Sequence, residues 1–182
     1  QHIRHEILGR EDELTGGDLI MVVKNNYFWL PEDREGFIAN GDIGKITRVK
    51  NIHEMYGFRF AEVQILFSDI DEEPLTCKVL LDTLYTETPN LPYHKQKLFF
   101  EEVMKDYEDI PTKSAKMEQL RANPYFNALQ IKFAYAVTCH KAQGGQWNAV
   151  FIDQGYLTEE MLNIDLLRWL YTATTRASKE LF

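Results

Sequence analysis

The spacing of apolar residues changes twice along this chain, and these changes constrain its fold more than any other feature. Between residues 18 and 81, a β-branched apolar run is followed by stretches in which apolar side chains recur at every second position, and both patterns are typical of strands. From Lys95 to Tyr107 they recur at three- and four-residue intervals, which is typical of an amphipathic helix. Period-two spacing returns from residue 129 to 137. The chain is therefore expected to have a mixed α/β fold.

The first period-two region contains several short strands separated by turns. Strands are predicted at residues 18–24, 43–49, 58–67 and 76–81. Asn40-Gly41-Asp42 precedes the second of these strands and is a typical tight-turn sequence. Four or five short strands in about 70 residues indicate a small β-barrel.

Helical and strand patterns follow the predicted barrel. Helices are predicted at residues 95–107 and 114–122, and Asn123-Pro124 would end the second helix. The rest of the chain has patterns typical of a strand, a turn, a second strand, a helix and a final strand, an order that indicates α/β structure. These later elements are predicted at residues 129–137, 148–153 and 164–177.

The composition is that of a folded globular protein. With 45% hydrophobic and 26% charged residues, collagen-like, disordered and membrane-spanning chains are excluded. The net charge of −8 means that nucleic acid would have to bind at a local basic cluster. Two cysteines, Cys77 and Cys139, and the lack of a signal-peptide pattern predict a reducing, cytoplasmic setting. The chain lacks an initiator Met and an apolar run begins at its end, so we expect a fragment of a longer protein.

The segment from residue 135 to 147 concentrates chemically active side chains where a predicted strand ends. A small-residue turn, Gly144-Gly145, would let a ligand approach the backbone closely there. A capped helix, in which Thr138 satisfies backbone donors and Lys141 is solvated, remains an alternative. A hydroxyl, an imidazole, an ammonium and an amide lie within six residues: Thr138, His140, Lys141 and Gln143.

A second segment places an arginine near the end of an apolar helix. Arg176 follows Thr172, Thr174 and Thr175, and a planar donor that is always charged suits the stabilisation of charge on a γ-phosphate. The alternative is a cation at a helix C-terminus that the helix dipole stabilises.

In this order, the two segments resemble motifs V and VI of superfamily 1 helicases, most closely those of the RecD-like branch. The family pattern is approximately T-x-H-K-S/A-Q-G-x-E, followed by Y-T-A-x-T-R-A. The stretches Gly17–Met21, Lys24-Asn25 and Asn40–Gly44 look like the SH3-like barrel inserted in the second motor domain of that branch. The residues that match the two motifs are Thr138, His140, Lys141, Gln143 and Gly144, then Tyr171, Thr172, Ala173, Thr175, Arg176 and Ala177.

The resemblance implies an incomplete second RecA-like domain, of the P-loop NTPase type, with an inserted small SH3-like β-barrel. Residues 1–13 would be the start of the RecA-like domain, as the helix after motif IV. Residues 14–88 would form the barrel and residues 89–128 a helical insertion. Residues 129–182 would return to the RecA-like domain with motifs V and VI.

The function implied is that of the C-terminal part of an ATP-dependent DNA helicase. It would move 5′ to 3′ on single-stranded DNA, unwind duplex junctions and use ATP with Mg²⁺. The chain lacks a G-x-x-x-x-G-K-S/T loop, since Gly41–Ile46 is too short, so the phosphate loop and metal ligands would lie in an RecA-like domain before Gln1. The fragment alone would be inactive and bind no metal. Further partners would be repair or nuclease subunits, as in an exonuclease complex, and no membrane.

The resemblance also implies a role for each motif residue. Arg176 would be the catalytic arginine at the transferring phosphoryl group, and Gly144, Gly145 and Gln146 would line the nucleotide. Gln146 replaces a Glu that the family often has, and its amide can still bond a ribose hydroxyl without adding charge. The residues facing the DNA backbone would be Thr138, His140 and Lys141.

Three adjacent aromatic residues, Tyr27, Phe28 and Trp29, form a further candidate DNA contact on the barrel. If exposed, they would stack on bases or separate a duplex. Alternatively, they fill the barrel or pack against the motor domain. The competing hypothesis for the whole chain is a non-catalytic interaction module, for nucleic acid or protein, derived from a helicase half.

Overall fold

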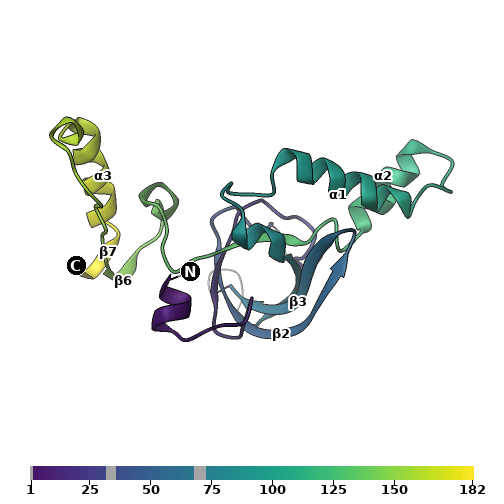
Figure 1. The fold of residues 1–182 in the computed structure, drawn as a ribbon, viewed down its shortest axis with the longest axis horizontal. Helices are drawn as coiled ribbons and strands as arrows, with labels where there is room; N and C mark the ends of the chain where they lie inside the picture. Colours follow the sequence, from purple (N-terminus) through teal and green to yellow (C-terminus); the bar gives the residue numbers. More distant parts are fainter. Residues whose placement is uncertain (1, 32–35, 68–72) are drawn as a thin grey trace. The chain divides into compact units, whose positions relative to one another are not determined.

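The computed structural model describes residues 2–31, 36–67 and 73–182. The chain folds into two compact units, residues 1–135 and residues 136–182. The first contains a β-barrel with two helices, and the second contains a two-stranded sheet with one α-helix (Figure 1).

Five strands close the barrel of the first unit, and four of them lie in the region where the sequence predicts a small barrel. Neighbouring strands are antiparallel, except that the fourth and fifth run parallel. In chain order they are β1 (Leu19–Val22), β2 (Ile43–Met55), β3 (Phe58–Leu66), β4 (Leu75–Leu80) and β5 (Leu129–Phe133).

Alternate residues of these strands fill the barrel. Ile46, Val63, Val79 and Ile131 come from four different strands and are fully buried in one core. Gly44, at the start of β2, packs so closely that a Cβ atom there would lie 2.5 Å from the Ile65 side chain. The Gly41–Ile46 segment is therefore a turn that enters a strand, as its sequence indicates.

The fifth strand lies where the sequence did not indicate. We expected residue 129 onward to open the RecA-like part, but β5 pairs with β1 and β4 and completes the barrel. The hydroxyl oxygen of Thr83 also accepts a hydrogen bond from the backbone amide of Ile131, at 3.1 Å. Period-two spacing identifies a strand, but it does not identify the sheet that the strand joins.

The helices between β4 and β5 have a hydrophobic core of their own. A 3₁₀-helix, η2 (Leu81–Tyr85), precedes α1 (Tyr93–Lys105) and α2 (Lys113–Ala122). These α-helices agree with those predicted at 95–107 and 114–122. They pack against the outer half of the long β2–β3 hairpin (Figure 1). The buried residues of this second core include Phe58, Phe60, Phe99, Val103 and Leu120.

A buried carboxylate connects the start of the chain to the barrel. Arg4 lies in a short π-helix, η1 (Ile3–Ile7), and its Nε lies 3.1 Å from both oxygens of Asp18. Arg10 Nη1 lies 2.8 Å from Asp18 Oδ1, and the hydroxyl of Tyr135, just after β5, donates to the same oxygen at 2.6 Å. Arg4 and Asp18 are 1% and 0% exposed. One carboxylate therefore joins three separate segments of the first unit.

Hydrogen bonds keep this carboxylate ionised. Burial alone would raise the pKa of Asp18, but hydrogen bonds from Arg4, Tyr135, the amide of Thr15 and Arg10 lower it below its ordinary value. The Asp18 charge therefore stabilises the folded state at neutral pH.

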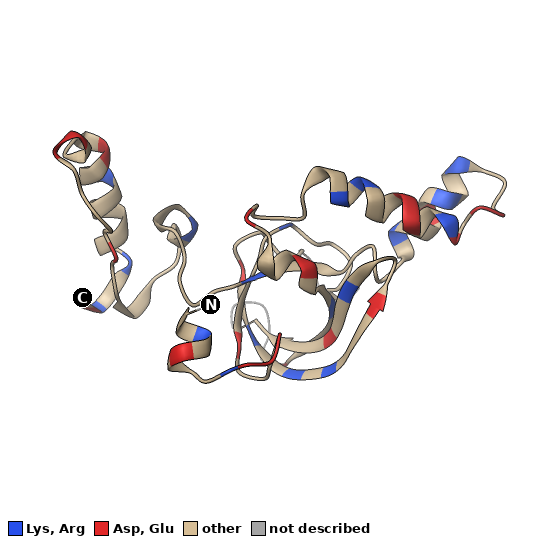
Figure 2. Ribbon diagram, viewed as in Figure 1, with Lys and Arg blue, Asp and Glu red and all other residues tan. Residues whose placement is uncertain are grey.

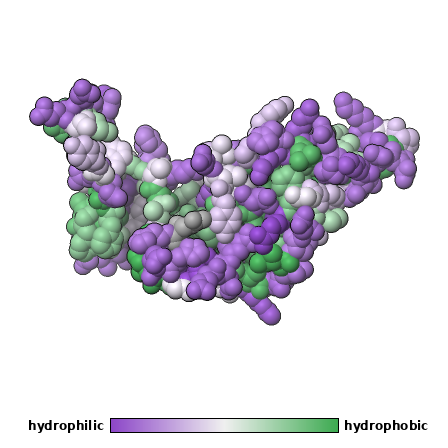
Figure 3. Space-filling model, viewed as in Figure 1, coloured by the Kyte–Doolittle hydropathy of each residue, from purple (hydrophilic) through white to green (hydrophobic). Residues whose placement is uncertain are grey.

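The second unit contains all of the segment that resembles motifs V and VI. Its two strands, β6 (Trp147–Val150) and β7 (Ala177–Leu181), pair in parallel. They agree with the second strand and the final strand that the sequence predicts for this part of the chain. Among the described residues, no helix is long and apolar enough to cross a membrane. Large apolar side chains are exposed on this unit, among them the stacked rings of Phe151 and Phe182 (Figure 3). Its elements are η3 (Cys139–Ala142), β6 (Trp147–Val150), η4 (Glu159–Met161), α3 (Ile164–Thr174) and β7 (Ala177–Leu181).

Replacing the buried carboxylate tests its structural role. Asp18→Asn should lower the free energy of unfolding by about 3–5 kcal/mol at pH 7, because Arg4 would keep a buried charge with no carboxylate. Urea denaturation followed by circular dichroism measures this loss. The control is Glu62→Gln, which removes a half-exposed carboxylate paired with Lys50 and should cost about 1 kcal/mol or less. Equal losses in the two variants would contradict this role for Asp18.

The same variant should show a defined pH dependence. Because the folded-state pKa of Asp18 is lowered, its contribution is complete above the unfolded pKa of about 3.9 and disappears as the pH falls through the folded value. The difference in stability between wild type and Asp18→Asn should therefore shrink below about pH 4. A difference that stays constant down to pH 2 would contradict the lowered pKa.

Candidate functional site

The two sequence segments that resemble motifs V and VI lie side by side in the second unit. In the β6–β7 sheet, Trp147 is opposite Ala177. The backbone amide of Trp147 donates to the carbonyl of Arg176 at 2.9 Å, and Ser178 Oγ donates to the carbonyl of Trp147 at 3.1 Å. Residues that are about thirty positions apart in sequence are therefore neighbours in one two-stranded sheet.

The guanidinium of Arg176 contacts both segments. Its Nη1 donates to the carbonyl of Gly145, its Nε to the carbonyl of Thr172 and its Nη2 to the hydroxyl of Thr175, each at 3.1 Å. The first bond reaches the turn that follows η3, and the other two reach the last turn of α3. The arginine therefore links the end of the helix to the glycine turn.

All three acceptors of Arg176 are neutral oxygens. Within the described part of the chain, no carboxylate forms an ion pair with this side chain, which is half-buried. A guanidinium retains its full charge under these conditions and can bind a phosphate in bidentate geometry. The helix-dipole alternative accounts for the bonds to the end of α3, but it does not account for the bond to Gly145.

The glycine turn is tightly packed on one side and exposed on the other. Gly144 has φ of +90°, a conformation that favours glycine, and the amide of Gly145 donates to the carbonyl of Ala142 at 3.2 Å. The indole of Trp147 lies against Gly145 so closely that a Cβ atom there would collide with the ring. The side chain of Gln146 is exposed. The turn is therefore exposed at Gly144 and Gln146, while the amide and the carbonyl of Gly145 are held by hydrogen bonds.

The three residues predicted to face DNA lie on or next to η3. The side chains of Thr138, His140 and Lys141 are exposed, whereas Ala142 is buried. The carbonyl of Thr138, and not its hydroxyl, accepts the first hydrogen bonds of the helix, from the amides of Lys141 and Ala142. The alternative in which the Thr138 side chain caps the helix is therefore not observed, and its hydroxyl remains exposed.

One contact fixes this helix on the rest of the unit. The thiol of Cys139 donates to the backbone carbonyl of Trp169 in α3 at 3.5 Å. The helix that ends next to Arg176 therefore also contacts the exposed loop that carries Lys141. The sequence did not indicate this role for Cys139, because a single cysteine has no pattern from which a partner can be found.

The aromatic residues of the barrel differ in their surroundings. Trp29 packs against the barrel core, and its Nε1 donates to the carbonyl of Asn127 at 2.8 Å. Phe28 is half-buried and contacts Trp29 edge to face. Tyr27 is 71% exposed, and its ring lies 4.8 Å from that of Phe37. The packing alternative describes Trp29, and Tyr27 offers an exposed aromatic face.

The residues of the second unit fit a phosphate group better than a metal ion. Among the described residues, no group of three or more His, Cys, Asp or Glu side chains is arranged to hold a metal. Arg176, which has only neutral partners, and the open turn at Gly144 supply positive charge and backbone close to each other.

Crowding at Gly145 provides a test of this geometry. Gly145→Ala should destabilise the second unit by about 1–3 kcal/mol, because the new methyl group must displace the indole of Trp147 or the turn. Amide hydrogen exchange at Trp147, whose amide donates to the carbonyl of Arg176, reports the loss locally. Replacing Trp147 by Leu in the same chain should restore part of the protection. Unchanged exchange in Gly145→Ala would show that the indole does not lie on this glycine in solution.

Comparison with known families agrees with the position of these motifs. Residues 133–182 match the model of the UvrD-like helicase C-terminal domain. No curated protein matches the chain. The matched residues include Thr138–Gln146 and Arg176, and the match supports a superfamily 1 helicase C-terminal region in this part of the chain.

Proposed function

We propose that this chain is the C-terminal motor region of an ATP-dependent DNA helicase of the RecD-like branch, which moves 5′ to 3′ on single-stranded DNA. The observation that carries the proposal is the position of Arg176. A helicase-family segment holds its guanidinium against the glycine turn through neutral oxygens alone. A cation without a carboxylate partner, next to open backbone, suits a nucleotide phosphate.

Arg176 and the glycine turn form the nucleotide side of the proposed site. ATP with Mg²⁺, when bound, supplies the phosphoryl group that is transferred to water. Arg176 would stabilise the negative charge that develops on that group, a role worth about 10³–10⁵ in rate in related phosphoryl-transfer enzymes. The backbone of Gly144 and Gly145 and the amide of Gln146 would line the nucleotide. The metal ligands and the phosphate loop would belong to a preceding RecA-like domain.

The same short loop provides the DNA side. Thr138, His140 and Lys141 expose a hydroxyl, an imidazole and an ammonium, which are donors suited to a phosphate backbone. Such contacts position a strand without recognising its sequence. The loop from Thr138 to Gln146 would therefore contact nucleotide at one end and DNA at the other, and this shared contact would couple the two ligands.

The first unit fits the same proposal. A five-stranded closed barrel before the helicase-like segment supports the RecD-like assignment, in which residues 14–88 belong to an SH3-like insertion. Because β5 completes the barrel, we extend this insertion to include residues 129–133. Residues 89–128 would be a helical insertion within it, and residues 1–13 would begin the motor domain. Partners would be single-stranded DNA, duplex junctions, the preceding motor domain and repair or nuclease subunits in the cytoplasm.

Removing the arginine tests the motor function. In the complete protein encoded by the reading frame that contains this chain, Arg176→Ala should lower ATP turnover by about a thousandfold or more. Affinity for single-stranded DNA should change little, because Arg176 lies on the nucleotide side. Phosphate release and fluorescence anisotropy with a labelled oligonucleotide measure the two quantities.

Arg168→Ala is the matched control for this experiment. Arg168 is exposed on α3, the helix that precedes Arg176, and pairs with Asp165, so its loss should leave turnover almost unchanged. If turnover persisted in Arg176→Ala, the catalytic role of Arg176 would be refuted. If the complete wild-type protein showed no ATP turnover, the motor proposal would be refuted in favour of a non-catalytic interaction module.

The exposed aromatic on the barrel provides a second test. Tyr27→Ala should weaken binding of single-stranded DNA by about 1–3 kcal/mol, because stacking on one base is lost. Tyr85→Ala, which removes another exposed tyrosine of the first unit, should leave affinity unchanged. Equal effects of the two substitutions, or none for Tyr27→Ala, would exclude Tyr27 as a base-stacking residue.

A further inference from the structure

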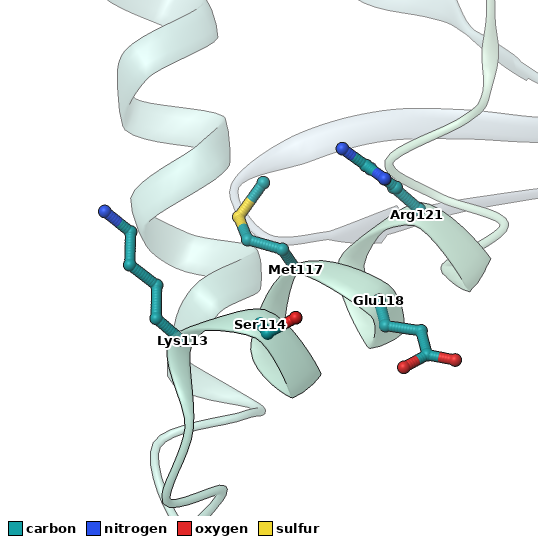
Figure 4. A pocket seen from close by; sticks show the side chains of 5 residues that line it. All are labelled: Lys113, Ser114, Met117, Glu118 and Arg121. Carbon is teal, nitrogen blue, oxygen red and sulfur yellow. The ribbon is translucent and has the colours of Figure 1, made fainter.

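A groove of about 640 Å³ lies along α2 in the first unit, which the motif residues do not occupy. Its lining comes entirely from one helix and contains no aromatic side chain. The residues that line the groove are Lys113, Ser114, Met117, Glu118 and Arg121 (Figure 4).

Two cations lie on one side of this helix. Lys113, Met117 and Arg121 are four residues apart in turn, so their side chains project from the same side of α2, whereas Glu118 points away (Figure 4). Eight residues of α-helix separate the two basic residues, a rise of about 12 Å. The groove therefore has a basic group at each end and a thioether between them.

These two cations have no acidic partner within the described residues. Within this part of the structure no ion pair involves Lys113 or Arg121, whereas Lys97 and Lys105 on α1 pair with Glu101 and Glu102. Figure 2 shows basic residues on both α1 and α2. The chain as a whole is acidic, with a net charge of −8. Two neighbouring cations without acidic partners therefore attract an anion to this position.

The helix that carries the cations is firmly held. Leu120 of α2 is fully buried in the same core as Phe99 of α1. The ammonium of Lys116 donates to the carbonyl of Glu108 at 3.0 Å, which holds α2 on the loop before it. The side-chain amide (Nδ2) of Asn123, the residue after the last turn of α2, donates to the hydroxyl of Tyr107 at 2.9 Å. Groups on a fixed helix keep their spacing and bind an extended ligand with little loss of freedom.

We propose that this groove binds the phosphodiester backbone of nucleic acid, as a second DNA contact of the helicase proposed above. One strand of a duplex carries a charge every 3.4 Å along the axis, so Lys113 and Arg121 would span about three nucleotide steps. Ser114 supplies a neutral donor for a phosphate oxygen. The lack of an aromatic face means that the groove contacts the backbone and does not stack bases.

Salt dependence of binding tests this inference on the 182-residue chain. A labelled single strand and a labelled duplex are titrated at several salt concentrations, and the slope of log affinity against log salt is measured. The double variant Lys113→Ala/Arg121→Ala should reduce the slope by about 1.4 for the single strand or about 1.8 for the duplex, because two phosphate contacts are lost. The form whose slope falls by its expected amount is the one that the groove binds.

The matched control is Lys97→Ala/Lys105→Ala, which removes the same charge from cations that are already paired. It should change the slope by less than half as much. Equal changes in the two double variants, or no binding by the wild type, would overturn the inference. Competition by polyglutamate as strong as that by an oligonucleotide would also overturn it, in favour of an acidic peptide. Arg176→Ala tests the proposed ATP turnover independently, so the two failures are distinguishable.

Discussion

The buried Asp18 carboxylate is the interaction on which the first unit depends most. It joins Arg4 and Arg10, from the segment before the barrel, to Tyr135 at the end of the last barrel strand. Separate segments meet at one charge that burial would otherwise make costly. Tyr135 is the last residue of the first unit and lies within the segment that matches the helicase family model.

The second unit depends on a different kind of contact. Neutral backbone and hydroxyl oxygens bind Arg176, so the side chain is positioned and its charge is not neutralised. This difference separates a structural arginine, such as Arg4 with its buried carboxylate, from one that can bind an added anion. The indole of Trp147 against Gly145 then fixes the turn that the guanidinium contacts.

Charge has a comparable role on the two α-helices of the first unit. The first helix pairs Lys97 and Lys105 with neighbouring acids, but the second leaves Lys113 and Arg121 unpaired. In an acidic chain, contacts to nucleic acid have to come from such local groups. On the barrel, Tyr27 is exposed, whereas Trp29, two residues later, packs against the core. Aromatic residues that are close in sequence therefore have different roles.

The sequence by itself determined the local structure and the candidate motif residues. Period-two and helical spacing located the strands β1–β4 and the helices α1–α3, because side-chain alternation depends only on neighbouring residues. Tertiary structure decided which distant residues make contact. The strand β5 closes the barrel, β7 pairs with β6, and the Asp18 carboxylate forms ion pairs with Arg4 and Arg10. Strand partners and buried ion pairs are contacts between distant residues, and no local pattern in one sequence encodes them.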